Sequence, residues 1–354
     1  MMNTAPKKRV LLGMSGGLDS TYAAGLLRKA GYEVVGAALV FSDETELDAA
    51  RIAAREVGIP LLEIDARERF ERYVIANFVE EYTSGRTPNP CVVCNRYVKM
   101  ALLYEEAVKG GFDHFATGHY ARIVEENGRF AVRMAKDHTK DQSYMLWGLS
   151  QEMLSMLLTP LADSDKSEIR KDALAVSLSA AKAKESQDIC FIPDGDYVSF
   201  IARYAEKHRL EALKNAFLTG EFVSREGISL GTHGGIVKYT VGQRKHLGIA
   251  LGYPAFVTEI DPATRRITLS PKEETGKGEI FVENLVFQAL EPQETGEITA
   301  TVKIRYAARP VLCTVKFSGT RAEVSFSEAQ RCPAKGQSAV FYREDTVLFG
   351  GVIS

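Results

Sequence analysis

The sequence predicts an α/β fold, a doubly wound parallel sheet followed by a small central domain and a C-terminal β-barrel. In the first 120 residues, apolar segments typical of strands alternate with amphipathic helical segments, the pattern of a parallel sheet with helices on both faces. From roughly Ser229 onward, glycine-rich turns and alternating Thr, Val and Ile replace helical periods, which is typical of a small barrel. We therefore expect three domains, at residues 1–200, 201–275 and 276–354.

The individual elements follow from the spacing of apolar residues and from turn signals. In the N-terminal part, strands are expected at 9–14, 33–41, 60–64 and 114–117, and helices at 19–30, 44–57 and 67–82. A hairpin is expected at 122–134 because Asn127-Gly128 favours a type I′ turn, and helical signals continue to residue 179. In the last third, strands are expected at 299–306, 313–317, 322–326 and 338–342.

Length and composition limit the class of protein. The 354 residues suffice for two or three domains, and 45% apolar with 25% charged residues is ordinary for a globular protein. No apolar run approaches the ~18 residues that span a bilayer, and the first nine residues lack the apolar segment of a signal peptide. We expect a cytoplasmic protein without a membrane partner. Its five cysteines are too few and too scattered for a disulfide framework, which leaves thiols, metal ligands or catalysts.

A glycine-rich turn at residues 12–20 reads Leu-Gly-Met-Ser-Gly-Gly-Leu-Asp-Ser and stands between an expected strand and an expected helix. Glycines permit backbone angles and close approach that a Cβ would obstruct. Ser15, Ser20 and the free amides at the helix start then point at one spot, where anions are favoured. The turn matches neither a Walker A loop nor Gly-x-Gly-x-x-Gly. It therefore predicts a cradle for pyrophosphate; the alternative is a tight turn that merely requires glycines.

Three cysteines stand in two polar loops. A proline-rich loop at 84–95 contains Cys91 and Cys94, and Cys190 follows about a hundred residues later. A helix is expected to begin near Arg96, so that its positive end and the Arg96 guanidinium would lower the pKa of Cys94 and enrich its thiolate. Taken alone, each thiol is more typical of a buried structural cysteine than of a catalyst.

Six further blocks change that interpretation. Together with the loop at 12–20, they resemble the tRNA-specific 2-thiouridylase family of ATP pyrophosphatases, whose fold is of the adenine nucleotide alpha-hydrolase type. The blocks are Arg-Thr-Pro-Asn-Pro at 86–90, Ala-Thr-Gly-His-Tyr at 116–120, Lys-Asp-Gln-Ser-Tyr at 140–144, Asp-Ile-Cys-Phe-Ile at 188–192, Thr-Val-Gly-Gln-Arg-Lys at 240–245 and Gly-Gln-Ser-Ala-Val-Phe-Tyr at 336–342.

The resemblance implies ATP-dependent thiolation of tRNA uridine 34, the wobble base, at C2. It implies Mg²⁺ bridging the ATP phosphates, and adenylation that turns the C2 oxygen into a leaving group. Sulfur would arrive as a persulfide on Cys190, and Cys94 would attack C2 or resolve the persulfide through a transient disulfide with Cys190. The implied ATP-binding residues are Gly13, Met14, Ser15, Gly16, Gly17, Leu18, Asp19, Ser20, Leu39 and Gly118.

The resemblance also implies two partners, the anticodon region of tRNA and a sulfur donor such as a cysteine desulfurase or sulfur-carrier protein. The implied tRNA-binding residues are Asn89, Pro90, Cys91, His119, Lys140, Asp141, Gln142, Arg305, Tyr306 and Gln337. The distribution of charge separately indicates a basic face that could bind RNA, because residues 201–250 carry eight Lys and Arg against four Glu. Lys238, Arg244, Lys245 and His246 are a candidate phosphate-binding patch, for which the alternative is an ordinary solvated face.

Two positions depart from the family pattern. Many members have Asp, with an assigned acid/base role, where this chain has Cys91, and a thiol cannot take over that role unchanged. Cys91, Cys94 and Cys190 could instead hold a [4Fe-4S] cluster with one open iron, whereas a closed zinc site lacks a fourth ligand. We favour the persulfide relay. The second departure is at Leu39, because the family often has a longer insert after this strand, and we expect the adenine pocket to differ.

Two other functions fit part of the sequence. A different ATP pyrophosphatase, such as an amidotransferase or an argininosuccinate synthase type, would share residues 12–20 but would not need two loop cysteines. A non-catalytic RNA-binding module would explain the basic segment and the barrel but would leave the pyrophosphate loop without a role. Cys313 and Cys332 have no motif around them and are interpreted as structural.

Overall fold

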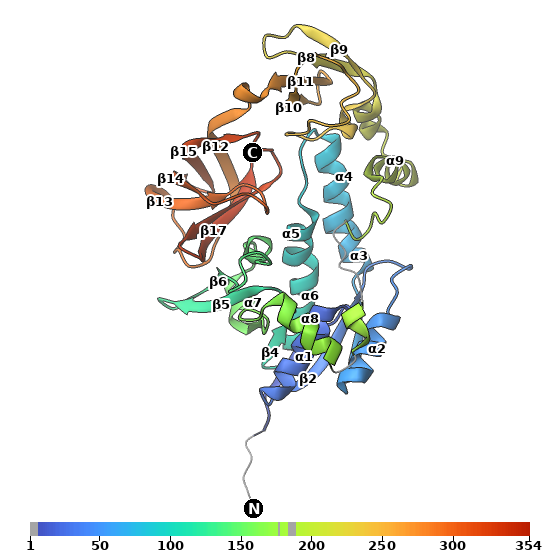
Figure 1. Cartoon of the computed structure of the whole chain (residues 1–354), viewed down its shortest axis with the longest axis vertical. Helices are drawn as coiled ribbons and strands as arrows, with labels where there is room; N and C mark the ends of the chain where they lie inside the picture. The colour runs from blue at the N-terminus through green and yellow to red at the C-terminus, as the bar shows by residue number, and fades with distance from the viewer. Residues whose placement is uncertain (1–5, 176–177, 183–188) are drawn as a thin grey trace, which may run out of the picture.

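The computed structural model describes residues 6–175, 178–182 and 189–354. Its strands form a five-stranded sheet, a four-stranded sheet and an eight-stranded sheet, of which six strands close into a barrel (Figure 1). The predicted fold class is confirmed. Asp188, the first residue of one sequence block, lies outside the described residues.

The N-terminal sheet has the order β3-β2-β1-β4-β7, and all neighbouring strands are parallel. Its strands are β1 (Arg9–Gly13), β2 (Glu33–Val40), β3 (Leu61–Asp65), β4 (His114–Ala116) and β7 (Leu157–Leu158). Leu11 packs with Leu103 on one face of the sheet, whereas Val10 and Leu12 pack in a different cluster on the other, because side chains alternate along a strand. Helices therefore cover both faces, as predicted. The two-residue strand β7 is not predicted by the sequence.

Two long helices of this domain each contain one π-helical turn. The helical elements up to residue 109 are α1 (Leu18–Lys29), α2 (Asp48–Val57), α3 (Arg67–Phe70), the π-helical η1 (Glu71–Ile75), α4 (Ala76–Thr83), α5 (Pro90–Cys94), the π-helical η2 (Asn95–Lys99) and α6 (Met100–Lys109). The helix predicted at 44–57 begins only at Asp48. The hydroxyl oxygen of Thr45 accepts hydrogen bonds from the backbone N–H groups of Phe41 and Ser42, so the segment before Asp48 forms a turn instead.

The predicted hairpin is present as β5 (Ala121–Glu126) and β6 (Arg129–Met134), with Asn127 and Gly128 at φ angles of 51° and 77°. Strand β6 also pairs with the barrel, at Arg133 and Thr346, a pairing that the sequence does not predict. The helical elements that follow are the 3-10 helix η3 (Ser143–Leu146), α7 (Gln151–Met156), α8 (Lys166–Ala175) and the 3-10 helix η4 (Ser179–Lys182). Within the described ranges, no helix has the length and apolar character needed to cross a bilayer.

The central part of the chain forms a helix and a small sheet of order β10-β11-β8-β9. Its elements are α9 (Tyr197–Lys207), η5 (Glu211–Phe217), β8 (Gly220–Val223), β9 (Ser229–His233), η6 (Ile236–Lys238), β10 (Ala255–Asp261), β11 (Arg266–Pro271) and η7 (Lys272–Glu274). The barrel strands are β12 (Gly276–Phe287), β13 (Thr295–Lys303), β14 (Val311–Ser318), β15 (Arg321–Arg331), β16 (Ser338–Arg343) and β17 (Thr346–Ile353).

The predicted strands at 313–317, 322–326 and 338–342 lie within β14, β15 and β16. The strand predicted at 299–306 is β13, which ends earlier, at Lys303. Direct pairing of β12 with β17 closes the barrel, and neither of those two strands was among the predicted ones.

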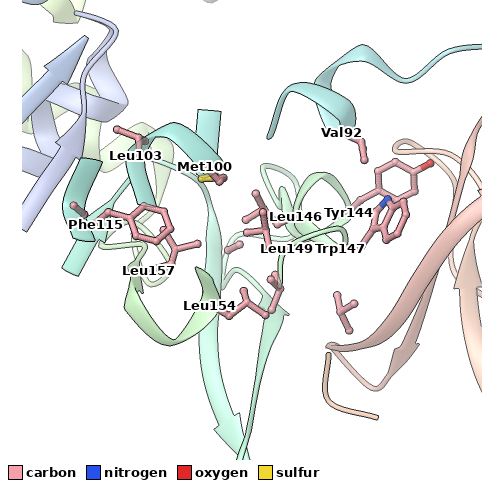
Figure 2. Close-up of a cluster of buried hydrophobic side chains, with 14 of the residues drawn as sticks. Val92, Met100, Leu103, Phe115, Tyr144, Leu146, Trp147, Leu149, Leu154 and Leu157 are labelled. Carbon is pink, nitrogen blue, oxygen red and sulfur yellow. The ribbon is translucent and has the colours of Figure 1, made fainter. Parts of the chain in front are cut away.

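A buried hydrophobic cluster joins the N-terminal domain to the barrel (Figure 2). Tyr144 and Trp147, which follow the hairpin, pack in the same cluster as Val340 and Tyr342 of β16. Trp147 lies so close to β17 that a Cβ added at Gly350 would stand 2.6 Å from its indole ring. A shared core of this kind fixes the barrel relative to the parallel sheet.

We expect Gly350→Ala to destabilise the protein, because the new methyl group would overlap the buried Trp147 ring. Overpacking of this type costs roughly 1–3 kcal/mol, measurable as a lower urea midpoint of unfolding. Gly278→Ala is the matched control, because Gly278 lies in a barrel strand with no atom near its Cβ position. Equal midpoints for the two variants would contradict the packing described for Trp147.

Candidate active site

The glycine-rich loop leaves β1 at Gly13 and enters α1 at Leu18. Gly16 adopts a φ of +79°, and a Cβ there would lie 2.3 Å from the backbone of Ala49, so this position requires glycine. The hydroxyl oxygens of Ser15 and Ser20 are 3.4 Å apart. Both serines therefore face one point at the N-terminus of α1, which is suited to bind an anion.

Asp19, in the first turn of α1, is paired with a lysine from a distant helix. Lys166, at the start of α8, donates to both carboxylate oxygens of Asp19 at 2.6 Å, and the Tyr120 hydroxyl donates to one of them at 2.8 Å. The Lys166 side chain is only 12% exposed, whereas the Asp19 side chain is 33% exposed, so the lysine is shielded from solvent and the carboxylate is only partly so. Lys166 was not among the predicted site residues.

A cavity of about 330 Å³ opens above the loop. Its lining includes seven of the predicted ATP-binding residues, namely Gly13, Met14, Ser15, Asp19, Ser20, Leu39 and Gly118. The other three do not line it: Gly16 packs against α2, Leu18 is buried, and Gly17 caps α1.

Gly118 faces the start of α1, where a Cβ would lie 2.9 Å from the carbonyl carbon of Asp19. Phe41, Thr45, Glu46 and Leu47, in and beside the turn that replaces the predicted start of α2, also line the cavity. The sequence did not predict that these four residues line the cavity.

The helix that carries Cys91 and Cys94 begins earlier than predicted. Pro90 is its first residue, and the Asn89 side chain caps it by accepting from the Val92 N–H at 3.4 Å. The prediction that a helix begins near Arg96 is wrong, because the Asn-Pro pair supplies an N-cap and an N1 proline. Cys94 therefore lies inside a continuous helix of α5, η2 and α6.

The predicted low pKa of Cys94 is also wrong. Burial raises the pKa of this thiol to about 11, although the charge of Lys99 opposes the shift. Cys91 and Cys190 are exposed by surface area, but the many protein atoms around their thiols partly desolvate them, which raises both pKa values. Cys91 and Cys190 both act electrostatically on Cys94, and Cys91 acts on Cys190, so the cysteine-bearing helix and the loop at Cys190 bring the three thiols into one neighbourhood. All five cysteines are free, and Cys313 and Cys332 are buried in the barrel region.

His119 and Lys99 belong to the wall of the loop cavity, and the charge of Lys99 also acts on the thiols. Both line the cavity, and the His119 ring bonds to the Thr117 hydroxyl at 2.9 Å. Burial, with a contribution from the charge of Lys99, lowers the pKa of His119 to about 3, so its ring is neutral near pH 7. Lys99 was not among the predicted site residues.

The three thiols do not fit a metal site. Among the residues that the structure describes, no group of three or more His, Cys, Asp or Glu side chains has a geometry that could hold a metal ion. Cys91, Cys94 and Cys190 therefore do not provide a ready set of cluster ligands in the described part of the chain.

Several predicted tRNA-binding residues gather around Tyr144. Its hydroxyl donates to the Ser338 carbonyl at 2.9 Å, and the nearby Asn89 side chain acts to lower its pKa, against the larger effect of burial. The Tyr306 ring stands 6.2 Å away and is itself 40% exposed. Gln337 donates to the carbonyls of Thr87 and Pro88. Asn89, Tyr306 and Gln337, far apart in sequence, thus meet at the junction of the barrel and the proline-rich loop.

The side chains at 140–142 are less available to RNA than predicted. Asp141 is 5% exposed and accepts from the backbone of Ala135 and from the backbone and hydroxyl of Ser143. In this conformation the Asp141 carboxylate accepts hydrogen bonds within its own loop and does not reach the surface. The structure therefore does not support Asp141 as a direct tRNA contact. The Gln142 side-chain oxygen accepts from the Tyr120 N–H at 3.0 Å. Lys140 is partly exposed.

The remaining predicted contacts are at the surface or close to it. Pro90 and Arg305 are partly exposed and Cys91 is exposed, and Arg305 donates to the carbonyl of Cys332. All four members of the predicted phosphate patch, Lys238, Arg244, Lys245 and His246, are exposed in the central domain. Arg244 and His246 border a surface hollow of about 680 Å³.

Comparisons with known proteins cover almost the whole chain. Family models described as a tRNA methyl transferase HUP domain, a tRNA methyl transferase PRC-barrel domain and an aminomethyltransferase beta-barrel domain match residues 8–194, 210–271 and 277–353. A tRNA-specific 2-thiouridylase MnmA from Clostridium perfringens is 41% identical over 98% of both chains.

A protein of the same name from Lachnoclostridium phytofermentans is 40% identical over 98% of this chain and 99% of its own. Among solved structures, an NH3-dependent NAD synthetase from Campylobacter jejuni matches with a TM-score of 0.36 and 18% identity, over 60% of this chain and 85% of that one.

We expect Gly118→Ala to weaken ATP binding about tenfold or more, because displacing the packed backbone of α1 costs roughly 1–3 kcal/mol. Calorimetric titration with ATP measures the change. Gly25→Ala is the control, since Gly25 lies on α1 itself with no atom near its Cβ position. Unchanged affinity in Gly118→Ala would show that the nucleotide does not use this end of α1.

The raised pKa of Cys94 predicts slow alkylation of the free protein at neutral pH. Only the thiolate reacts, and a raised pKa means that the thiolate forms at higher pH. The alkylation rate of Cys94 should therefore increase about tenfold per pH unit up to about pH 11. Iodoacetamide labelling, followed by peptide mass spectrometry, gives the rate for Cys94, with free cysteine as the reference. A rate that already levels off at pH 8 would contradict the shift.

Proposed function

The chain belongs to the tRNA-specific 2-thiouridylase family of ATP-dependent tRNA-thiolating enzymes, and we propose that it replaces the C2 oxygen of uridine 34 by sulfur through a persulfide relay. The observation that carries the proposal is that the cavity above the pyrophosphate loop and the three thiols share one residue. Lys99 lines the cavity above the pyrophosphate loop, and its charge also acts on Cys91, Cys94 and Cys190. Activation by ATP and delivery of sulfur can therefore occur on one bound base.

In the first step, the loop holds ATP while the C2 oxygen of the base attacks the α-phosphorus and pyrophosphate leaves. Ser15, Ser20 and the amides at the start of α1 would bind the departing pyrophosphate. Leu39 and Gly118 would lie beside the adenosine. Mg²⁺ would accompany the phosphates and neutralise part of their charge. Such a site needs only one or two carboxylates from the protein, and Asp19 lies at the loop.

In the second step, the terminal sulfur of a Cys190 persulfide attacks C2, and the C–O bond breaks as AMP leaves. The Cys94 thiolate then attacks the Sγ atom of Cys190, which forms a Cys94–Cys190 disulfide and leaves the outer sulfur on C2. An external thiol reductant returns the two cysteines to thiols. A cysteine desulfurase or a sulfur-carrier protein would supply the next persulfide sulfur.

The RNA would lie across all three proposed domains, residues 1–200, 201–275 and 276–354. The junction at Tyr144 would receive the anticodon loop, where a flipped base could enter beside Asn89 and Pro90. The exposed side chains of Lys238, Arg244, Lys245 and His246 would contact phosphates farther along the RNA. Lys140, His119 and Arg305 would be further contacts.

The relay predicts that Cys190→Ser and Cys94→Ser each reduce 2-thiouridine formation by roughly a thousandfold or more, because neither serine can carry or resolve a persulfide. The measurement is nucleoside mass spectrometry of tRNA after incubation with ATP, cysteine and a cysteine desulfurase. Cys313→Ser should retain wild-type activity, since Cys313 lies in the barrel core and donates only to the Ala300 carbonyl.

Two results would contradict the relay. One is equal thiolation by wild type and Cys190→Ser. The other is anaerobically purified protein that contains about four irons per chain and loses activity on chelation. That result would favour a [4Fe-4S] cluster held by the same three cysteines.

A further inference from the structure

A π-helical turn places Lys99 on the side of the helix that carries Cys94. In a regular α-helix, a residue five positions on lies about 140° around the axis. In η2 the Met100 N–H instead donates to the carbonyl of Asn95, five residues back, and the wider turn brings position i+5 closer to the side of the helix that carries position i. The Lys99 charge accordingly acts on the Cys94 thiol, where it opposes the rise of the pKa that burial causes. π-turns of this kind occur frequently at functional sites.

Lys99 is the basic side chain shared by the two halves of the proposed site. Together with Ser20, Gly118 and His119 it lines the cavity of the pyrophosphate loop, and it is partly buried. Lys166, the other lysine of this region, is tied to Asp19. In the part of the chain that the structure describes, no carboxylate forms an ion pair with Lys99. Its charge is therefore available to a ligand.

The second step of the proposed reaction creates an electrostatic problem. A sulfur anion must approach a carbon whose leaving group, the adenylyl phosphate, is also negative, and two negative charges repel strongly in a partly desolvated site. A cation in contact with the phosphate and next to the sulfur removes that repulsion and also stabilises the charge that develops on AMP.

We propose that Lys99 is a catalytic residue of the sulfur-transfer step, which contacts the α-phosphate of the adenylated uridine and draws the incoming sulfur anion toward C2. This inference rests on the proposed function and assigns a role to a residue outside its motifs. Lys99 forms no covalent bond in the step. The sulfur–carbon bond forms and the carbon–oxygen bond breaks as described above, and AMP carries away the electron pair.

The test separates the two steps in a single turnover of the full chain with tRNA, ATP, cysteine and a cysteine desulfurase. In Lys99→Met we expect pyrophosphate release to remain within about threefold of wild type. AMP release and 2-thiouridine formation should slow about a hundredfold, the size typical of losing one charge-stabilising group, and adenylated tRNA should accumulate. Lys99→Arg, which retains the charge, should recover most of the rate. Lys109→Met is the matched control, because Lys109 is 77% exposed at the end of the same helix.

Three outcomes would overturn the inference: equal slowing of pyrophosphate and AMP release in Lys99→Met, unchanged AMP release, or no recovery in Lys99→Arg. If Lys99→Met does not fold, as judged by its circular dichroism, Lys99→Gln takes its place with the same expectations. Absence of 2-thiouridine with the wild-type protein would contradict the proposed function itself. Thiolation by wild type together with a normal Lys99→Met would contradict only the role of Lys99.

Discussion

The geometry of the site depends on one helix, which runs from the proline-rich loop to the pyrophosphate loop. It begins at the Asn89 cap, carries Cys91, Cys94 and Lys99, and continues to Leu103, whose side chain would lie 2.9 Å from a Cβ at Gly13. Its far end thus packs against the strand that leads into the anion cradle. The separation between cradle and thiols is therefore set by helical rise and by a close contact at glycine, and not by a flexible loop.

The near end of this helix is fixed by the barrel. Gln337 donates to the carbonyls of Thr87 and Pro88, and Tyr144, whose hydroxyl lies near Asn89, donates to the carbonyl of Ser338. Tyr144 in turn belongs to the core that the barrel shares with the parallel sheet (Figure 2). Buried packing of this type permits few alternative arrangements. A barrel remote in sequence therefore determines where the cysteine-bearing helix begins, and with it the place where an RNA base could enter.

The sequence predicted those parts of the site that local patterns encode. A strand, a glycine-rich turn and a helix in succession indicate the anion cradle, and spaced motifs point to Cys94 and Cys190 as candidates for sulfur transfer. The true start of the cysteine-bearing helix was also readable, since Asn89-Pro90 is a capping signal, but it was interpreted as part of a loop. Lys166 could not be found in this way, because its pairing with Asp19 spans 147 positions and leaves no local pattern. The π-turn is equally invisible, since nothing at 95–99 departs from an ordinary helical sequence.

Charge in the free site bears on Cys91, the position at which the family resemblance implies Asp in many members. Burial raises the pKa of Cys91 and of Cys94, so both are neutral thiols near pH 7. An aspartate at position 91 would be ionised and close enough to Lys99 to compete for its charge. A neutral thiol leaves the Lys99 cation to the phosphate and to the sulfur anion that arrives with the persulfide. A thiol in place of the carboxylate thus lacks an acid/base group but strengthens the electrostatic role of the lysine about two helical turns away.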